Sequence, residues 1–150
     1  MSSTDQTGPS NKYENLLAIK DFEQAAKKFL PHCVFEYLRG GTEDEVTLTA
    51  NRDAFDLLAF RPRGLCDVSE RSQSVELWGK HYSSPIGIAP TCVAGIVRHE
   101  CDSMLALESA RANIPFIISG ASNVPLERLA ELNPDSWYQG YFPSDREQIS

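Results

Sequence analysis

Three short apolar runs in the second half of the sequence end in polar side chains: Thr91 after the first, Ser119 after the second, and Gln139 with Tyr141 after the third. The carboxyl ends of parallel strands meet at one mouth of a barrel, so these four side chains would be neighbours there. Hydroxyl and carboxamide groups offer paired donors and acceptors to a neutral polar ring. A tyrosine hydroxyl can orient a carboxylate or a developing alkoxide. None of the four is a strong general base.

A purely structural role is the alternative for several of these residues. Ser119 and Gly120 are also typical of a turn that ends a strand, and Tyr141 is typical of an amphipathic residue at a rim. Tyr37, on a predicted helix beside apolar residues, is more typical of a core aromatic with a hydrogen-bonded hydroxyl than of a ligand contact. The residues alone leave both interpretations open.

The elements that position these residues follow the order strand, helix, strand, helix, strand. In chain order we expect a strand at 86–89, a helix at 102–112, a strand at 116–118, a helix from Pro125 to Asn133, and a strand at 137–141. The run at 86–89 is wholly apolar, which favours a strand covered on both faces, as in a parallel sheet. The helix at 102–112 is expected to place Leu107, Ala110 and Ile114 on one apolar side. The pattern predicts an α/β fold, the first part of a TIM (β/α)8 barrel.

A helical segment precedes these strands. Three helices are expected, from Asp21 until Pro31, from Pro31 until Gly40–Gly41, and from about Thr42 until shortly before Phe60. Asp21 with Gln24 resembles a capping box, which would start the first helix. The third helix is expected to bury a stripe of small and apolar residues, namely Val46, Ala50, Ala54 and Leu57. Alternation between 73 and 88, with a turn at Gly79, predicts short strands before the barrel.

These patterns predict three regions: a disordered tail at 1–14, a helical preface with short strands at 15–84, and the first three βα strands of a barrel at 85–150. A cap pattern at 144–147 predicts one more helix. A complete barrel of this kind takes about 250 residues, and the chain has 150. We therefore expect an incomplete barrel, from a fragment or a truncated product, with open sheet edges.

Composition and charge narrow the class of partner. The net charge is −7, and the absence of a dense Lys/Arg run argues against nucleic acid, whose binding requires clustered basic residues. No apolar stretch approaches the length of a membrane span, and the first residues are polar rather than a signal sequence. We expect an intracellular, cytoplasmic protein that acts on a small polar substrate.

The four cysteines show no metal-binding pattern. Cys33, Cys66, Cys92 and Cys101 contain no CxxC pair, and with the three histidines they form no recognised zinc spacing. We expect free thiols and no metal.

Several segments, in order and spacing, resemble the FMN-dependent 2-hydroxy acid oxidases and dehydrogenases, a family that includes glycolate oxidase, lactate oxidase and mandelate dehydrogenase. The resemblance runs from about Ile19 to the end of the chain. The segments that carry it are Leu30–Pro31, Phe35–Tyr37, Gly41–Asp44, Asn51–Phe55, Phe60–Arg63, Pro85–Thr91, Ile118–Asn123 and Trp137–Tyr141.

The resemblance implies a barrel that holds FMN at its mouth and oxidises a 2-hydroxy acid to a 2-oxo acid. It implies that Pro90, Thr91 and Cys92 lie along the flavin, that Ser119 and Gln139 hydrogen-bond to it, and that Tyr37 and Tyr141 contact the substrate. The family's catalytic histidine, its carboxylate-binding arginines and its lysine near the flavin are expected beyond Ser150.

Three positions depart from the family pattern. Residues 98–101 read Arg-His-Glu-Cys where the family usually has a His-Pro-x-Gly turn, so a different loop conformation is expected. Gly140 replaces a larger apolar residue, which weakens the third strand. Ala121 stands where glycolate oxidases have tryptophan and the mandelate and lactate branches have smaller residues, which predicts a roomier substrate pocket.

Two other functions stay open. The chain is alternatively a non-catalytic fragment or interaction module whose open edges are covered by self-association, as a homo-oligomer, or by a partner. Another phosphate-binding barrel enzyme shares the strand-end arrangement but lacks the helical preface that carries Tyr37.

Overall fold

The computed structural model describes residues 16–142. The chain divides into two compact units, residues 1–60 and residues 61–150. The expected tail at 1–14 and the expected cap at 144–147 lie outside the described residues. The mixture of helices and short strands agrees with an α/β protein, and residues 16–142 form no closed barrel.

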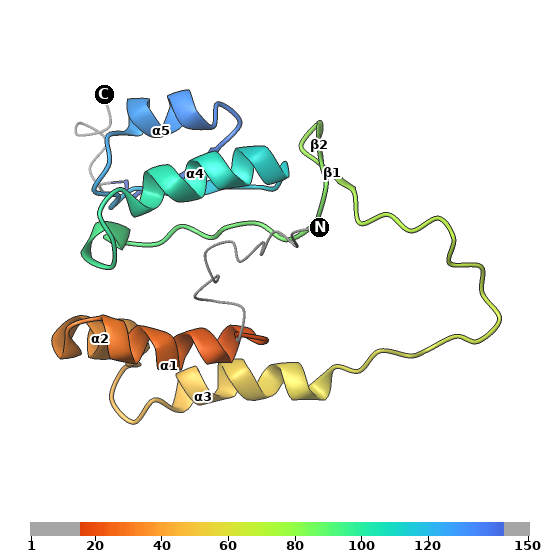
Figure 1. Ribbon diagram of the computed structural model, residues 1–150, viewed down its shortest axis with the longest axis horizontal. Coiled ribbons are helices and arrows are strands. Elements are labelled where there is room, and N and C mark those ends of the chain that lie inside the picture. Colours follow the sequence, from red (N-terminus) through yellow and green to blue (C-terminus); the bar gives the residue numbers. More distant parts are fainter. Residues whose placement is uncertain (1–15, 143–150) are drawn as a thin grey trace, which may run out of the picture. The chain divides into compact units, whose positions relative to one another are not determined.

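The first unit is helical (Figure 1). Its elements are α1 at Ile19–Phe29, α2 at His32–Arg39, α3 at Val46–Asp53 and a 3₁₀ helix at Ala54–Leu57. α1 packs against α2, and Phe35 of α2 is buried, with 4% of its surface exposed. The three expected helices are therefore present.

Their boundaries differ from the expected ones for local reasons. Asp21 is not the N-cap of α1 but its third residue, because its carboxylate accepts the backbone N–H groups of Leu17 and Ala18 at 3.0 and 2.8 Å. α3 begins at Val46 rather than near Thr42. Glu43 and Glu45 have φ values of 51° and 57°, a left-handed conformation that a helix cannot include.

The buried stripe expected on the third helix is wrong. Val46 is 72% exposed and Leu57 is 85% exposed, and Ala50 and Ala54 are exposed as well. Helical periodicity predicts which side chains share a face, but it does not predict whether another layer covers that face. No side chain among the described residues of this unit covers the stripe.

The second unit contains two pairs of strands and two longer helices. Its elements are β1 at Val75–Leu77, β2 at Lys80–Tyr82, a 3₁₀ helix at Ala94–Ile96, α4 at Cys101–Ala112, β3 at Ile117–Ser119, α5 at Leu126–Leu132 and β4 at Trp137–Gln139. α4 and α5 lie side by side (Figure 1). Every βα element expected between residues 100 and 142 is present, and each starts and ends within two residues of its predicted bounds.

β1 and β2 form an antiparallel hairpin in which Leu77 pairs with Lys80. The two loop residues, Trp78 and Gly79, have φ values of 49° and 79°, as the tight two-residue turn of a hairpin requires. The turn expected at Gly79 is confirmed. The hairpin packs against the start of β4 through an edge-to-face contact of Trp78 with Trp137, with ring centroids 4.3 Å apart, and an ion pair joins Lys80 to Asp135.

β3 lies between two parallel neighbours. It pairs with β4 along its length, and the backbone N–H of Ile117 binds the carbonyl of Ile88 at 3.1 Å on its other edge. The expected strand at 86–89 is reduced to this single bridge, and Ile86 is 72% exposed. Pro85 and Pro90 flank the run, and since proline has no backbone N–H it cannot extend the ladder.

The core of the second unit lies between the helices and one face of these strands. Ala106 of α4, Phe116 and Ile118 around β3, and Leu129 of α5 form a buried cluster. The face of α4 that packs inward carries Asp102, Ala106 and Ser109. The apolar side expected at Leu107, Ala110 and Ile114 is not the most buried one, because Leu107 and Ile114 are half-buried and Ala110 is exposed.

Polar groups on that face are satisfied. The hydroxyl of Ser109 donates to the carbonyl of Ala106 at 2.8 Å and accepts the side-chain N–H of Asn133 at 3.0 Å. Both Ser109 and Asn133 are buried. A buried polar group costs little when it is hydrogen-bonded, so a helix can bury a serine where a pattern-based prediction looks for an apolar residue.

Leu129→Ala is expected to destabilise the protein by about 2–5 kcal/mol, because Leu129 is fully buried and its removal leaves a cavity between α4 and α5. Leu126→Ala in the same helix is the matched control: Leu126 is 47% exposed, and its loss should cost less than about 1 kcal/mol. Urea unfolding measures both. Equal losses would contradict this description of the core.

Candidate functional site

The parallel register between β3 and β4 places Ser119 directly opposite Gln139. Paired residues of neighbouring strands point to the same face of a sheet. Ile118 of β3 belongs to the core under the helices, so Ser119 and Gln139 share the opposite face. Two of the residues predicted to bind a ligand are therefore neighbours, although 20 positions separate them in sequence.

Ser119 is 6% exposed, and its hydroxyl already makes one hydrogen bond, as an acceptor. The oxygen accepts the backbone N–H of Ala121 at 3.2 Å, which fixes the side chain and leaves the hydroxyl hydrogen to donate to an acceptor. The amide nitrogen of Gln139 lies 3.5 Å from the carbonyl of Gly140, a long and weak hydrogen bond. Both groups are thus able to hydrogen-bond a ligand.

The loop after Ile88 is joined to the turn after β3. The backbone N–H of Val93 donates to the carbonyl of Ala121 at 3.1 Å, and the N–H of Gly95 donates to the side-chain oxygen of Asn123 at 3.2 Å. These bonds bring residues 90–92 to the same end of the strands as Ser119. Thr91 and Cys92 are exposed there, and the Thr91 hydroxyl donates to the carbonyl of Ala89 at 3.4 Å.

Val93 holds this loop in an uncommon conformation. Its φ of 51° and ψ of 38° lie in the left-handed region, which a β-branched residue rarely adopts. Glu100, just before α4, is left-handed as well, with a φ of 57°. In residues 98–101 the positive φ therefore falls on Glu100, and Cys101 is already the first residue of the helix.

Gly120 lets the turn approach β4. A Cβ at this position would stand 2.7 Å from the carbonyl oxygen of Gln139 and 3.4 Å from the ring of Tyr141. The ring of Tyr141 therefore lies beside the turn, although 74% of the side chain is exposed. β4 ends at Gln139, so the predicted third strand is two residues shorter than expected, and Tyr141 is in the segment that follows it.

Tyr37 belongs to the helical unit. It lies on α2 and is 64% exposed. The alternative in which Tyr37 is a core aromatic is therefore wrong, because the helix buries Phe35 instead. An exposed tyrosine hydroxyl is available to a ligand.

Two small cavities flank the turn at 119–124. One, of about 240 Å³, is lined by Ser119, Gly120, Tyr138 and the start of α5. The other, of about 310 Å³, is lined by Gly95, Asn123 and the residues that begin α4. Burial and the neighbouring Asp102 carboxylate raise the pKa of the Cys101 thiol at this second cavity, so the thiol stays protonated at neutral pH and is a poor nucleophile.

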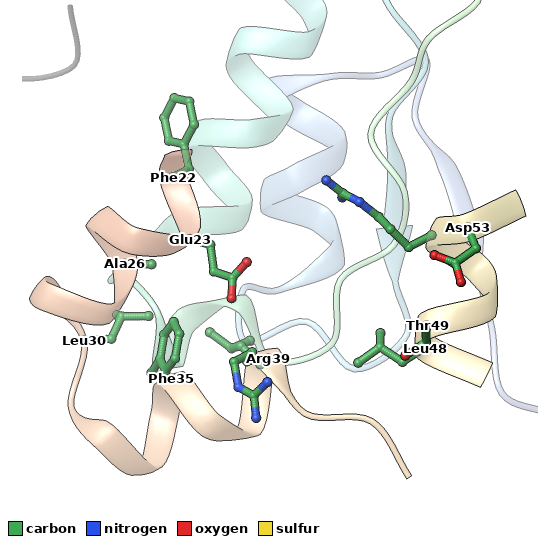
Figure 2. Close-up of a pocket in the computed structure, with 11 residues that line it drawn as sticks. Phe22, Glu23, Ala26, Leu30, Phe35, Arg39, Leu48, Thr49 and Asp53 are labelled. Atoms are coloured by element: carbon green, nitrogen blue, oxygen red, sulfur yellow. The ribbon is translucent and has the colours of Figure 1, made fainter. Parts of the chain in front are cut away.

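A wider groove of about 720 Å³ lies in the helical unit (Figure 2). Its apolar lining comes from Phe22 of α1, Leu30 just after α1, Phe35 of α2 and Leu48 of α3. Charged side chains such as Arg39 stand among them. None of the residues predicted to bind a ligand lines it. The groove is typical of a face between helices and offers no cluster of catalytic groups.

Other classes of site find no support in the described residues. Within residues 16–142, no three His, Cys, Asp or Glu side chains gather to hold a metal ion. The four cysteines are free, as expected. No helix in this part of the chain has the length and apolar character needed to cross a membrane.

The polar residues that hold the turn in place were not among the predicted site residues. Ser122 donates to the carboxylate of Asp102 at 2.6 Å and accepts the N–H of Val124 at 3.1 Å. Asn123 binds Gly95, as described above. A signal was present, because Ser and Asn shortly before a proline at a helix start are typical capping and turn residues.

Comparisons with known proteins agree on one family. The family model described as FMN-dependent dehydrogenase matches residues 26–150. The chain is 41% identical over 129 residues to (S)-mandelate dehydrogenase of Pseudomonas putida, covering 85% of this chain and 33% of the relative. It is 35% identical over 133 residues to L-lactate oxidase of Lysinibacillus sphaericus, covering 87% of this chain and 34% of the relative.

Solved structures give the same result. A soluble mutant of the membrane-associated (S)-mandelate dehydrogenase from Pseudomonas putida superposes with a TM-score of 0.80 at 42% identity, covering 85% of this chain and 37% of that one. The present chain thus spans about a third of the length of these relatives.

Gly120→Ala is expected to destabilise the protein by about 1–3 kcal/mol, because the new Cβ would collide with the backbone carbonyl of Gln139. Gly64→Ala is the control: no atom lies within 4 Å of a Cβ there, so the change should stay within about 0.5 kcal/mol. Urea unfolding of both variants measures the difference. A neutral Gly120→Ala would mean that the turn does not approach β4 this closely.

Proposed function

Because the chain belongs to the family of FMN-dependent dehydrogenases, we propose that it supplies part of an enzyme that oxidises a 2-hydroxy acid to a 2-oxo acid. The observation that carries the proposal is the pairing of Ser119 with Gln139 at the ends of parallel strands. Relatives named for mandelate and lactate support the substrate class.

The proposed architecture is the first part of a (β/α)8 barrel. Residues 85–150 contribute its first three βα strands, and residues 15–84 form a helical preface that carries Tyr37. The parallel order of Ile88, β3 and β4, each separated from the next by a helix, supports this assignment.

The groups at the strand ends fit the cofactor of the family. The flavin ring presents carbonyl and ring-nitrogen acceptors beside an N–H donor, and Ser119 has a free hydroxyl hydrogen while Gln139 has both a donor and an acceptor. We assign these two residues to hydrogen bonds with the ring and assign Pro90, Thr91 and Cys92 to its face. When bound, FMN supplies the redox chemistry and takes up the two electrons that the substrate loses.

Substrate binding is assigned to Tyr37 and Tyr141. Both hydroxyl-bearing side chains are exposed, and a phenol hydroxyl can donate to a carboxylate or to a developing alkoxide. We place the proton-abstracting group outside residues 1–150 and expect a product of these residues alone to show no turnover.

The protein expressed from its complete coding sequence is expected to bind FMN and to lose its visible flavin absorbance when a 2-hydroxy acid is added without oxygen. The reason is that electrons from the substrate hydroxyl carbon reduce the flavin. Anaerobic absorbance spectra measure this. The control is an acid of the same size without the hydroxyl group, which has nothing to oxidise and should leave the spectrum unchanged.

A folded complete protein that holds no flavin would contradict the proposed function. The intact mass of the protein from its native cell distinguishes the enzyme from the alternative, a non-catalytic interaction module. If the mature protein has the 16.7 kDa mass of these residues and carries no flavin, the interaction module becomes the better description, and analytical ultracentrifugation would then show whether it associates with itself.

Ala121→Trp is expected to narrow the substrate pocket. Ala121 follows the strand end that carries Ser119 and is only partly buried, so an indole there would obstruct bulky side chains. We expect kcat/KM for mandelate to fall about tenfold or more relative to that for lactate. Ala121→Ser, of nearly equal volume, should leave the ratio unchanged. An equal loss for both substrates at full flavin content would contradict the pocket assignment.

A further inference from the structure

Asp102 is a buried carboxylate with a specific partner. It lies in the first turn of α4 and is 5% exposed. Carboxylates are rarely buried unless paired, because removing the charge from water is costly. Its Oδ2 accepts the hydroxyl hydrogen of Ser122 at 2.6 Å, a short distance typical of a charge-assisted hydrogen bond. Its place at a helix N-terminus further stabilises the negative charge.

Ser122 connects this carboxylate to the turn after β3. Its hydroxyl oxygen accepts the N–H of Val124 at 3.1 Å, while its own N–H donates to the carbonyl of Ser119 at 3.1 Å. The hydroxyl of Ser122 therefore uses both its donor and its acceptor capacity, and Asp102 is linked through Ser122 to Ser119.

The same turn determines how Ser119 presents its side chain. The hydroxyl oxygen of Ser119 accepts the N–H of Ala121, the residue immediately before Ser122. If Ser122 loses its side-chain anchor, Ala121 is held only through its carbonyl, which accepts the N–H of Val93. The bond from the Ala121 N–H that orients the Ser119 hydroxyl is then weakened. A change at Asp102 would therefore reach the strand end without touching a ligand.

We propose that Asp102 is a positioning residue, which acts through Ser122 to hold the 119–124 turn in the shape that aims the Ser119 hydroxyl at FMN. This inference rests on the proposed function. It assigns Asp102 no contact with substrate or cofactor. A change at Asp102 should alter the binding and the spectrum of the flavin in addition to the stability of the fold.

Ser122→Ala in the FMN-loaded complete protein tests this role, because it leaves the Asp102 carboxylate buried without its hydroxyl partner. The dissociation constant of FMN should rise about tenfold or more, and the visible flavin bands should shift relative to wild type. Asp102→Asn is the milder variant: it keeps an acceptor for Ser122 but not the charge, so the rise should be smaller, about threefold.

Ser109→Ala is the matched control. Ser109 is also a buried residue of α4 with a hydrogen bond to another element, the side chain of Asn133, but it lies two turns further along the helix, away from the 119–124 turn. It should lower the urea midpoint while the FMN dissociation constant and the flavin spectrum stay those of wild type.

The double variant Asp102→Ala with Ser122→Ala removes both partners. Since no unpaired carboxylate is then left in the interior, its FMN affinity should be no worse than that of Ser122→Ala alone. A double variant that binds FMN more weakly than Ser122→Ala alone would show that the two residues act independently and would overturn the proposal.

Two further outcomes separate the proposal from the function on which it rests. If wild type binds FMN but Ser122→Ala and Asp102→Asn lower only the urea midpoint, as Ser109→Ala does, the pair is structural and the positioning role is wrong. If the folded wild-type protein holds no FMN, both the proposed function and this inference fail.

Discussion

The register between β3 and β4 is the constraint on which the candidate site depends. It aligns Ser119 with Gln139, and because side chains alternate between the faces of a strand, a slip of one residue would turn one of them toward the helices. The pairing is short, with three residues on each strand. Short ladders specify register weakly by themselves, so the packing on either side of the strands must fix it.

That packing comes from both faces. On the helix side, Phe116 and Ile118 pack with Leu129 of α5, so a slipped β3 would expose its apolar residues. At the start of β4, the hairpin fixes Trp137 through Trp78, and Lys80 pairs with Asp135. Contacts at the start of β4 and on the helix side of the strands thus hold Ser119 and Gln139, the candidate site residues at the strand ends, in place. In barrels, stability and function likewise reside at opposite ends.

The sequence predicted an element well where neighbouring residues determine its structure, and poorly where residues distant in sequence do. The turn at Gly79 and the helix α4 follow from local chemistry and were predicted well. The inward face of α4 was not, because Asp102 and Ser109 are buried only where Ser122 and Asn133 supply partners. No periodicity in the sequence indicates such partners.

The strand predicted at 86–89 failed for a local reason instead. Its apolar character favoured a buried strand, but Pro85 and Pro90 restrict the ladder and Ile86 is exposed. Which predicted binding residues lie close together depends on the order of the strands and less on their length. One parallel bridge at Ile88 is enough to bring the Thr91 loop beside the turn after β3.

The chemistry available at these strand ends is neutral, and this limits what the residues can do. A hydroxyl, a carboxamide and a phenol can bind a polar ring without the free-energy cost of burying a charge. Neutral donors hold a carboxylate more weakly than a charge-assisted pair does. In this chain the buried charge lies one step away, at Asp102, where it holds the turn through Ser122. In the proposed function, the Asp102 carboxylate thereby makes the site rigid without placing a negative charge against the carboxylate of a 2-hydroxy acid.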